Sequence, residues 1–485
     1  FSKPKNNIVN YKKFTNLYEL FKFQFKNNPD KKFVFSKINK IWTGLTFRQL
    51  KVQVDKLIFF FQVNKIKKKD RILLISTNRI EWFLFDIAIQ AVGAITVPCF
   101  STNNTSDNDF IIKDCSPKLI ILENYNIYKK NETILRNKNK VIFIESHENF
   151  FSLKKILNKK HKKIIIPKIK RNDLSSIIYT SGTSGRPKGV MLSHGSILHN
   201  CEAAYHLLVD FNIQNERFLS FLPLSHSYER MAGLYFPLSI GAEIFYSESI
   251  EKVINNLTEI KPTMMTAVPR FYENVYRKLV SKFLKSNFLI KALFKCKLNA
   301  LERTNLSLQE KLKIFFFNLL ISKKIQNIFG GKLKTFVSGG AALSPKIGNF
   351  FLSIGVCILQ GYGQTEAGPL ISCNNMRNNS TKTVGAPVKD VEVMISSDKE
   401  ILVKGPNLMN GYWNNKYLTK KTIKNGWLHT GDLGYLDKSK RIIINGRIKD
   451  LIITSGGDNI SPNKIENLLM INPYIDQAIV YGNYK

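Results

Sequence analysis

Tyr179-Thr180-Ser181-Gly182-Thr183-Ser184-Gly185-Arg186-Pro187-Lys188-Gly189 is the most informative stretch of the 485-residue sequence. The apolar run 176–179 at its start predicts a strand that leads into a loop. Glycines let a backbone turn with positive φ and approach a ligand closely, and successive backbone N–H groups form a nest that binds anions. Because four hydroxyl side chains and Lys188 add donors and a mobile positive charge, the loop suits a polyphosphate.

Two other interpretations of this loop are weaker. A Walker A loop follows the pattern GxxxxGK[ST], whereas here Lys188 precedes Gly189 and Pro187 interrupts the pattern. A flexible surface turn would explain the serines, but it would not explain a Pro-Lys-Gly ending so soon after a strand.

On either side of the loop, helix-like patterns alternate with short apolar runs. Strands are predicted at 71–76, 94–100 and 118–123, and helices at 81–92 and about 195–210. This βαβ rhythm is typical of a parallel sheet that is covered by helices.

Two regions depart from this rhythm. The tract 128–171 holds 14 basic and 3 acidic residues and is expected to be a solvated connection at the periphery. After residue 385 the segments become short, with strands predicted at 391–395, 400–404 and 441–445. We therefore predict an α/β fold whose large N-terminal domain, 1–448, consists of helix-covered sheets and ends in a β-rich subdomain at about 385–448. Residues 449–485 would begin a C-terminal lobe and leave hardly any room for a core.

The formal charge of +37, from 73 Lys and Arg against 36 Asp and Glu, first suggests a nucleic acid or an anionic membrane as a partner. However, 59 of the basic residues are lysines and only 14 are arginines, the preferred residue for bidentate recognition of phosphates and bases. Lys, Asn, Ile and Phe share AT-rich codons, so genome composition explains much of the excess. The stretch 172–250 is even net acidic, with 4 basic and 7 acidic residues. We therefore predict no nucleic-acid partner.

The six cysteines form no CxxC pair and are too few for a disulfide framework, which favours a reducing, cytoplasmic location. Residues 281–324 alternate Phe, Leu and Ile with lysine, with 10 basic and 2 acidic residues, and predict a basic amphipathic helical hairpin. Such a hairpin either packs on the core with a solvated lysine face or makes a peripheral contact with an anionic membrane. The sequence leaves both readings open, and it does not indicate an oligomeric state.

Gln360-Gly361-Tyr362-Gly363-Gln364-Thr365-Glu366-Ala367 is a second specific motif. Tyr362 lies between two glycines and can expose a ring face for stacking on a base. Thr365 can donate a hydrogen bond to a phosphate, and Glu366 beside a phosphate makes sense mainly if Mg²⁺ bridges the two. The alternative is a purely structural role, in which the motif is a turn at the end of a strand with one solvated glutamate. The presence of the phosphate loop argues against this alternative.

Three further motifs are less specific on their own. Val337-Ser338-Gly339-Gly340-Ala341-Ala342-Leu343 predicts a strand that ends in a glycine turn, which lets a flat ring approach or is simply a tight turn. Leu222-Pro223-Leu224-Ser225-His226-Ser227-Tyr228-Glu229-Arg230 contains a histidine that, alone, is more often a packed side chain than a catalytic one. Trp427-Leu428-His429-Thr430-Gly431-Asp432-Leu433-Gly434 supplies a carboxylate that can accept from two ribose hydroxyls.

Taken together and in their order along the chain, the motifs resemble the adenylate-forming (AMP-binding) superfamily of acyl-CoA synthetases, luciferases and nonribosomal peptide synthetase adenylation domains. The resemblance covers roughly Thr46 to Lys485. The Tyr-Glu-Arg that follows His226, and the stretch 262–272, resemble the long-chain fatty acid–CoA ligases (long-chain acyl-CoA synthetases) in particular. The resemblance implies that 449–485 is the truncated start of a small, mobile α+β C-terminal domain.

The resemblance also implies roles for individual residues. The phosphate loop would hold the β- and γ-phosphates of ATP, the 339–341 turn the adenine, Asp432 the ribose and Glu366 the Mg²⁺. Lys449 would be a hinge, and the loop 455–462 would help to build the thioester site. The implied catalytic residues are Thr183, Lys188, His226, Glu366 and Arg447, and the implied nucleotide-binding residues are Thr180, Ser181, Gly182, Ser184, Gly185, Gly189, Gly339, Gly340, Ala341, Gly361, Tyr362, Gly363, Thr365, Asp432 and Lys449.

The implied function is the ATP-dependent activation of a fatty acid to an acyl-adenylate, followed by transfer to coenzyme A. ATP, Mg²⁺ and coenzyme A would be the cofactors or co-substrates, and a long-chain fatty acid the substrate. A medium-chain or aryl acid ligase and a catalytically silent nucleotide-binding module remain alternatives, and a nucleic-acid binder has only the net charge behind it.

Two departures from the family pattern affect these expectations. Arg230 stands where some members place a gating tryptophan, four residues after His226. The sequence ends before the position of the family's adenylation lysine, so we expect a fragment that is deficient in the adenylation step.

Overall fold

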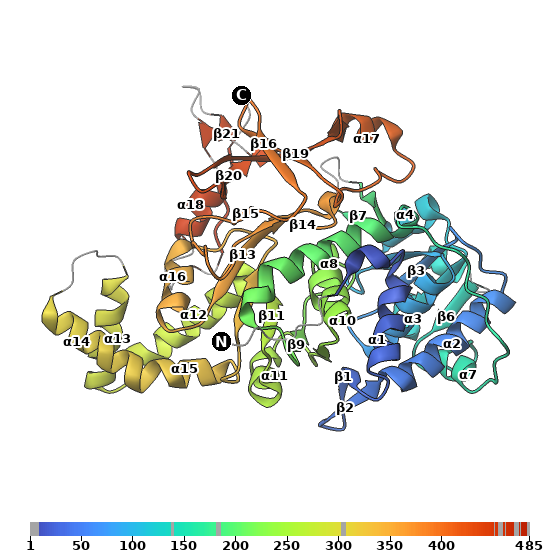
Figure 1. Cartoon of the computed structure of the whole chain (residues 1–485), viewed down its shortest axis with the longest axis horizontal. Coiled ribbons are helices and arrows are strands. Elements are labelled where there is room, and N and C mark those ends of the chain that lie inside the picture. The colour runs from blue at the N-terminus through green and yellow to red at the C-terminus, as the bar shows by residue number, and fades with distance from the viewer. Residues whose placement is uncertain are drawn as a thin grey trace. The chain divides into compact units, whose positions relative to one another are not determined.

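The computed structural model describes residues 9–136, 140–180, 186–301, 307–450, 452–453, 459–460, 462–469, 475 and 477–482 (Figure 1). The chain divides into two compact units, each of which is built from several segments. Unit 1 comprises Phe1–Asn256, Gln364–Leu370 and Pro406–Lys421, and unit 2 comprises Leu257–Gly363, Ile371–Gly405 and Thr422–Lys485.

Unit 1 contains a six-stranded sheet in the order β6-β5-β3-β4-β7-β8. The five strands from β6 to β7 pair in parallel, and β8 runs antiparallel to β7. The strands are β3 (Arg71–Ile75), β4 (Ile95–Cys99), β5 (Leu119–Leu122), β6 (Val141–Phe143), β7 (Leu174–Thr180) and β8 (Lys188–Ser193). The strands predicted near 71–76, 94–100, 118–123 and 176–179 are therefore confirmed.

Helices cover the six-stranded sheet. Buried side chains of α4 (Thr105–Cys115), α5 (Tyr125–Lys129) and α6 (Glu132–Leu135) join one core cluster with the strands. The helix α3 (Ile80–Ala91) packs on β4 and against α1 (Leu17–Asn27) and α2 (Phe47–Val63). Every residue of α3 except Glu81 is buried, as expected for a helix that is apolar on all sides. A capping box between Thr46 and Gln49 begins α2.

A second group of unit 1 strands runs in the order β9-β10-β1-β2. The parallel strands are β9 (Arg217–Ser220), β10 (Glu243–Tyr246) and β1 (Lys32–Ile38), and β2 (Ile41–Thr46) closes a hairpin with β1. The remaining segments of unit 1 are η1 (Tyr11–Lys13), α7 (Leu153–Leu157), α8 (His194–Leu208), η3 (Val209–Phe211), α9 (Ser227–Glu229), η4 (Arg230–Tyr235, a π-helix), α10 (Phe236–Ile240) and η6 (Thr365–Ala367).

The tract 128–171 is not merely a solvated connection, as its lysines had suggested. Its residues Val141–Phe143 form β6, which pairs with β5 at the edge of the six-stranded sheet. All three side chains are buried, and because successive side chains of a strand point to opposite faces, both faces of β6 are covered.

Five strands of unit 2 run in the order β15-β14-β13-β12-β11. They are β11 (Met264–Ala267), β12 (Thr335–Ser338), β13 (Ile358–Gly363), β14 (Leu370–Cys373) and β15 (Ala386–Pro387). The neighbouring helices are α12 (Pro269–Leu284), α13 (Phe288–Ala300), α14 (Leu308–Phe317), η5 (Asn318–Ser322), α15 (Lys323–Ile328) and α16 (Pro345–Ser353), and α11 (Val253–Ile260) runs across the boundary of the two units. Tyr272 of α12 and Phe329 both pack edge-on against Phe336 of β12, which ties these helices to the sheet.

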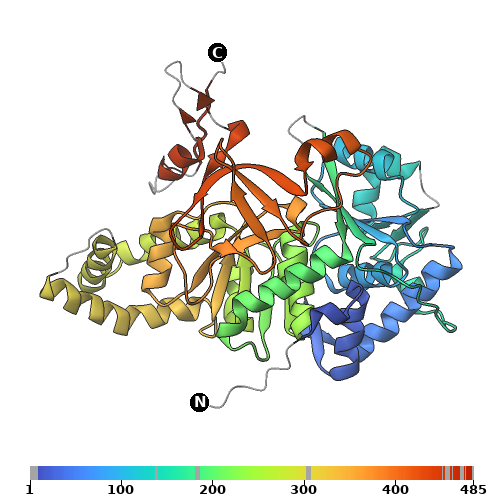
Figure 2. The same cartoon turned by 45° about the horizontal axis from the view of Figure 1, so that its top comes forward.

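Unit 2 also contains a small antiparallel sheet, the orange-red strands of Figure 2. It consists of β16 (Glu392–Ile395), β17 (Glu400–Lys404), β18 (Ile423–Lys424), β19 (Trp427–Leu436) and β20 (Ile442–Arg447). The helix α17 (Lys416–Thr422) precedes β18 and belongs to unit 1 except for its last residue. The segments η7 (Ile448–Asp450), β21 (Ile452–Ile453), β22 (Asn459–Ile460) and α18 (Pro462–Leu469) follow. The predicted α/β class and its small β-rich part are confirmed, whereas the expected domain boundary at residue 449 stays a prediction.

Candidate active site

The β7–β8 hairpin determines where the phosphate loop begins and ends. Thr180 pairs with Lys188, and Tyr179 pairs with Gly189, so the loop spans the closed end of a two-stranded ladder. Thr180 Oγ1 is buried and makes no hydrogen bond within the described part of the chain. The predicted loop residues Ser181, Gly182, Thr183, Ser184 and Gly185 lie outside the described residues.

Lys188, the first residue of β8, lies in a three-residue contact cluster. Its Nζ is 2.6 Å from Glu366 Oε1 and 2.9 Å from the hydroxyl of Tyr412. The Tyr412 hydroxyl is also 2.8 Å from the same carboxylate oxygen, and Lys188 Nζ lies 4.7 Å from the centre of the Tyr412 ring. The cluster therefore holds an ammonium group and a carboxylate in contact directly after the phosphate loop.

Tyr412 reaches this cluster because residues 409–413 run alongside β8. The Trp413 N–H donates to Gly189 O at 2.7 Å, and Val190 and Tyr412 form an isolated antiparallel bridge. The Met409 N–H donates to Glu366 O at 2.9 Å, which joins the segment to the predicted site. A Cβ on Gly189 would lie 2.8 Å from Ile177 Cγ2, so only glycine fits under this segment.

Thr365, the residue before Glu366, connects this cluster to the motif that contains His226. The Oγ1 of Thr365 is 3.0 Å from the Oγ of Ser227, the residue after His226. His226 caps α9, and its Nδ1 accepts the N–H of Tyr228 at 3.1 Å. The neutral imidazole therefore carries its proton on Nε2. Its side chain is exposed, although surrounding protein atoms still desolvate the ring enough to lower the pKa of His226.

Arg230 occupies the position expected for a gate, but it is a buried structural residue. Its guanidinium Nη2 lies 2.7 Å from Asp86 Oδ1 in α3, and the Tyr235 hydroxyl donates to Asp86 Oδ2 at 2.5 Å. Burial works to lower the pKa of Arg230, and the negative charge of Asp86 outweighs it and keeps the guanidinium charged. The pair ties the π-helix η4, which continues from α9, to the buried helix α3.

The predicted ribose site in unit 2 is a second cluster. The Tyr362 hydroxyl donates to Asp432 Oδ2 at 2.6 Å, and Arg447 Nε donates to Asp432 Oδ1 at 3.0 Å. Tyr362 and Asp432 are buried, whereas the Arg447 side chain is mostly exposed. Each carboxylate oxygen of Asp432 therefore accepts a hydrogen bond from one of these two side chains.

The structure places the remaining nucleotide-binding candidates around β12 and β13. Gly340 has φ +84°, a conformation that favours glycine, and the Gly339 N–H donates to Ala267 O at 3.2 Å. Gly361 and Gly363 lie in β13, and Ala341 follows Gly340 in the turn after β12. Lys449 lies in the short helix η7, and much of the expected thioester loop, residues 455–458 and 461, lies outside the described residues.

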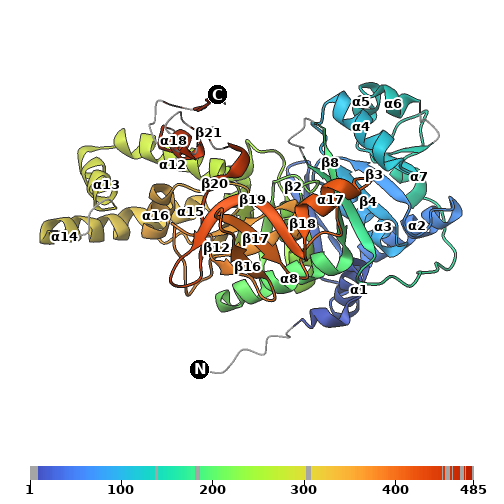
Figure 3. The same ribbon diagram turned by 90° about the horizontal axis from the view of Figure 1, so that it is seen from above.

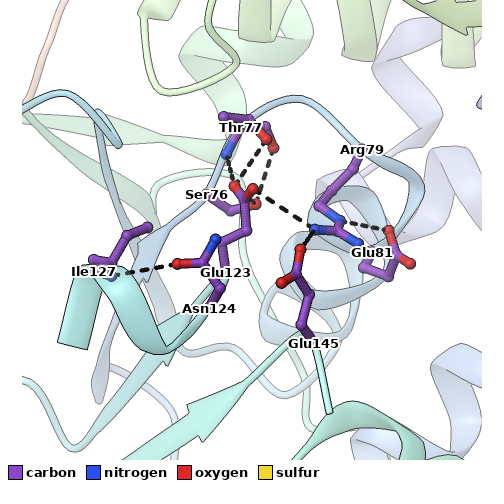
Figure 4. Close-up of polar contacts among 8 residues, drawn as sticks. All are labelled: Ser76, Thr77, Arg79, Glu81, Glu123, Asn124, Ile127 and Glu145. Atoms are coloured by element: carbon purple, nitrogen blue, oxygen red, sulfur yellow. Dashed lines mark hydrogen bonds and ion pairs between the residues drawn. The ribbon is translucent and has the colours of Figure 1, made fainter. Parts of the chain in front are cut away.

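A polar cavity of about 440 Å³ in unit 1 was not expected from the sequence. It lies where β3, β4 and β5 end, a common place for ligand sites in parallel sheets. Glu123 lines this cavity, and Figure 4 shows it accepting hydrogen bonds from the N–H and the hydroxyl of Thr77, at 2.6 and 2.8 Å. Arg79 Nη1 contacts Glu145 at 2.9 Å in the same network. None of the predicted site residues lines this cavity.

The donor groups around Lys188 fit a magnesium–phosphate site better than a cage made only of protein ligands. No cluster of three or more His, Cys, Asp or Glu side chains suited to a metal occurs among the described residues. Mg²⁺ is commonly bound by one or two carboxylates together with substrate phosphates, and Glu366 supplies one such carboxylate beside a phosphate loop. The contact with Lys188 Nζ already shows that a cation is accommodated at Glu366 Oε1.

Comparisons with known proteins identify the family of this chain. The model of the AMP-binding enzyme family matches residues 21–413. Long-chain-fatty-acid–CoA ligase FadD15 of Mycobacterium bovis is 28% identical over 95% of this chain and 79% of its own length. Long-chain-fatty-acid–CoA ligase ACSBG2 of Gallus gallus is 28% identical over 96% of this chain and 66% of its own length. Long chain acyl-CoA synthetase 3 of Arabidopsis thaliana is 27% identical over 100% of this chain and 78% of its own length.

Solved structures show the same fold at lower sequence identity. The anthranilate CoA ligase AuaEII in complex with anthranoyl-AMP has a TM-score of 0.77 at 19% identity and covers 96% of this chain and 83% of its own. O-succinylbenzoate coenzyme A synthetase MenE from Bacillus subtilis, in complex with ATP and a magnesium ion, has a TM-score of 0.73 at 22% identity, with coverages of 96% and 87%. Since the family pattern extends from residue 21 to residue 413, the chain belongs to the AMP-binding enzyme family.

Proposed function

We propose that this protein is an AMP-forming acid–CoA ligase that activates a carboxylic acid with ATP and transfers the acyl group to coenzyme A. The contact of Lys188 with Glu366 and Tyr412, directly after the phosphate loop, carries the proposal. Membership of the AMP-binding enzyme family supports it, as do the activities after which the three relatives are named.

In the first step, a carboxylate oxygen of the acid attacks the α-phosphorus of ATP, and the bond to the bridging oxygen of the β-phosphate breaks. Pyrophosphate leaves, and an acyl-adenylate remains. We infer that the loop 180–189, with Thr183, orients the β- and γ-phosphates, and that Lys188 exchanges its contact with Glu366 for a phosphate oxygen. Thr365 would donate to the α-phosphate, and His226 would line the carboxylate end of the acid site. Such positioning and charge neutralisation are the main sources of catalysis in phosphoryl transfer.

In the second step, the sulfur of coenzyme A attacks the acyl carbon, the acyl–phosphate bond breaks, and AMP leaves. Activation makes this step feasible because AMP is a far better leaving group than oxide. The thiol proton passes to solvent. Lys449 and the loop 455–462 are our candidates for the hinge and for the thioester site.

Glu366 is our candidate magnesium ligand, and the ion would supply charge neutralisation between the phosphates. Thr365, next to it in η6, has a hydroxyl of the hard oxygen type that suits the same ion. The adenosine part would be held in unit 2, with adenine at Gly339, Gly340, Ala341 and Tyr362 and with the ribose hydroxyls at Asp432 and Arg447.

A long-chain fatty acid is the substrate that we propose. The sequence around His226 supports this choice, as do the three relatives, each of which is named as a long-chain fatty acid–CoA ligase or long-chain acyl-CoA synthetase. An aryl acid is the second candidate, because the solved relatives include anthranilate and o-succinylbenzoate ligases.

The test is to measure AMP and pyrophosphate formation by the full-length protein with ATP, coenzyme A and each of four acids: oleate, octanoate, coumarate and acetate. Turnover with oleate well above the other acids is the expected result. Turnover only with acetate would refute the long-chain substrate, and turnover only with coumarate would support the aryl alternative. ATP binding without turnover of any acid would favour the silent nucleotide-binding module.

ATP binding, measured by calorimetry on the chain itself, gives a separate test of the site. Lys188→Ala should weaken ATP binding about tenfold or more, because a hydrogen bond to a charged group contributes roughly 1.5–3 kcal/mol. The exposed Lys160 provides a matched control, and Lys160→Ala should leave the affinity unchanged. Equal affinities for both variants would contradict the role of Lys188.

A further inference from the structure

A continuous apolar row lies on the outer surface of α14 and η5. It consists of Leu308, Leu312, Phe315, Phe316, Leu319 and Leu320, which we call the outer row. All six side chains are exposed, from 44% for Phe316 to 85% for Leu308. The spacing of i, i+4, i+7, i+8, i+11 and i+12 keeps them on one side of the helix.

The opposite side of the same helical segment is already packed in unit 2. Phe317, Ile321 and Ile325 are buried, and the ring of Phe317 lies 6.0 Å from that of Phe294 in α13. Lys297 of α13 donates to Asn318 at 3.0 Å and to Ser353 O at 2.9 Å. These bonds fix which side of the hairpin faces the rest of unit 2. The outer row therefore does not face the core of this unit. Packing of the hairpin on the core explains the buried side of the helix, with Phe317, Ile321 and Ile325, but not the exposed outer row.

The surroundings of the outer row are strongly basic. Lys311, Lys313, Lys323 and Lys324 are exposed on the same helical segment. Across 281–324, the sequence carries 10 basic and 2 acidic residues. Figures 1 and 3 both show α13 and α14 side by side at one end of unit 2. At the start of α13, Phe288 is 88% exposed, which extends the apolar character to the second helix.

We propose that the outer row and its lysines dock this protein on the surface of an anionic lipid bilayer. A helix that combines apolar side chains with flanking lysines lies in the interface, with the apolar groups among the acyl chains and the ammonium groups at the phosphates. No described helix is both long enough and apolar enough to cross a bilayer.

A second copy of the chain is a poorer occupant of this surface. A symmetric dimer through the outer row would bring the two lysine sets together, and like charges at an interface oppose association. An acidic partner protein would match the charge but would need an apolar ridge or groove complementary to six exposed side chains. A bilayer needs no such fit, since its surface adapts to the shape of the helix.

The experiment is co-sedimentation with vesicles of phosphatidylcholine alone and of phosphatidylcholine and phosphatidylglycerol in equal parts, at low and high salt. We expect binding to the mixed vesicles, weakened by salt, and little binding to the neutral ones. The triple variant L312Q/F315Q/L319Q should bind on the order of 100-fold more weakly, because three apolar side chains no longer enter the bilayer. K311Q/K313Q/K324Q should bind at least about tenfold more weakly at low salt.

Matched controls come from other exposed side chains. I165Q/I250Q/Y417Q removes three exposed apolar groups elsewhere, and K160Q/K162Q/K163Q removes three exposed lysines elsewhere. Both should bind like the unchanged protein. Equal binding by the outer-row variant and its control would overturn the proposal, as would failure of the unchanged protein to bind mixed vesicles. A dimer in solution that the outer-row variant abolishes, without vesicle binding, would also overturn it in favour of a second copy.

Discussion

Replacing Arg230 by methionine should destabilise unit 1 by about 3–5 kcal/mol, because it removes one partner of a buried ion pair. Asp86 accepts Arg230 Nη2 at 2.7 Å, and the side chains of the two residues are 0% and 2% exposed. Thr96 and Tyr235 donate to the same carboxylate at 2.6 and 2.5 Å. Methionine preserves the length of the apolar stem but leaves the carboxylate without its cation.

The magnitude follows from what remains after the substitution. Two neutral hydroxyl donors and the amide of Gln90 still stabilise the carboxylate, so the loss should not approach the full cost of burying a bare ion. Asp86→Asn alone should cost a similar amount, because the guanidinium then loses its counter-ion. In the double variant D86N/R230M both charges are absent, and an amide oxygen can still accept from the hydroxyls. Its loss should be clearly smaller than the sum of the two single losses.

Urea unfolding followed by tryptophan fluorescence measures this effect. Trp82 lies 5.8 Å from the Arg230 guanidinium and reports on its surroundings. With an m value of about 3 kcal/mol per molar urea, the midpoint of R230M should fall by about 1 M or more. The control is Arg217→Met, which removes an arginine from an exposed ion pair with Glu243 in the same unit. It should cost about 0–1 kcal/mol.

Two results would refute this reasoning. If R230M and R217M had the same midpoint, the buried pair would not be a structural element of unit 1. If the loss in D86N/R230M equalled the sum of the single losses, the two charges would not be coupled. Either result would also remove the argument that the pair holds η4, and with it the segment that follows His226, against α3.

Three further predictions concern the site and its surroundings. Tyr412→Phe removes the hydroxyl that contacts Lys188. This substitution should weaken ATP binding about tenfold and change the unfolding midpoint little. Calorimetry that showed tighter ATP binding by the variant would contradict this. Gly340→Ala should cost about 1–2 kcal/mol in unfolding free energy, because alanine disfavours φ +84° although the nearest atom, 3.6 Å away, leaves room for its Cβ; an unchanged midpoint would contradict it. Burial lowers the pKa of His194 to about 3, whereas the unfolded residue has a pKa near 6.5. Below about pH 6.5 the unfolded chain therefore binds a proton that the folded chain excludes. The free energy of unfolding should fall there by up to about 1.4 kcal/mol per pH unit. Urea unfolding at two pH values should show that His194→Asn removes this part of the pH dependence and that His161→Asn, at an exposed site, does not.

The strands of the six-stranded sheet could be predicted because each is a run of apolar residues bounded by polar ones. β3 (Arg71–Ile75) and β5 (Leu119–Leu122) are buried on both faces, so they appear in the sequence as uninterrupted apolar runs. β6 (Val141–Phe143) was missed because its three apolar residues are embedded in a lysine-rich tract. The composition of the tract describes its surface, whereas only the pairing with β5 determines that the strand exists.

In the candidate site, backbone requirements could be predicted more easily than side-chain partners. The glycines at 189 and 340 stand out because a close approach or a positive φ excludes other residues. Tyr412 had no comparable signal: it lies 224 residues from Lys188, and only the bridge to Val190 brings it there. Gly411, with φ +120°, was the nearest local sign of an unusual backbone beside it. Likewise, the sequence showed that Arg230 replaces the expected gate, but not that Asp86 of α3 would pair with it.

The positive charge of the chain shows why composition alone could not find these functions. Three lysines illustrate three different environments. Lys188 is partly exposed and in contact with a carboxylate at the end of a phosphate loop. Lys297 is buried, its pKa is lowered by that burial, and it links α13 to Asn318 and Ser353. Lys311 is fully solvated beside an apolar row. A lysine count assigns the same value to all three, whereas the neighbouring groups decide whether the charge binds a ligand, supports a helix or faces a membrane. Only the third kind adds to the long-range attraction of an anionic surface, so the membrane contact should depend on a few lysines near the outer row rather than on the net charge of +37.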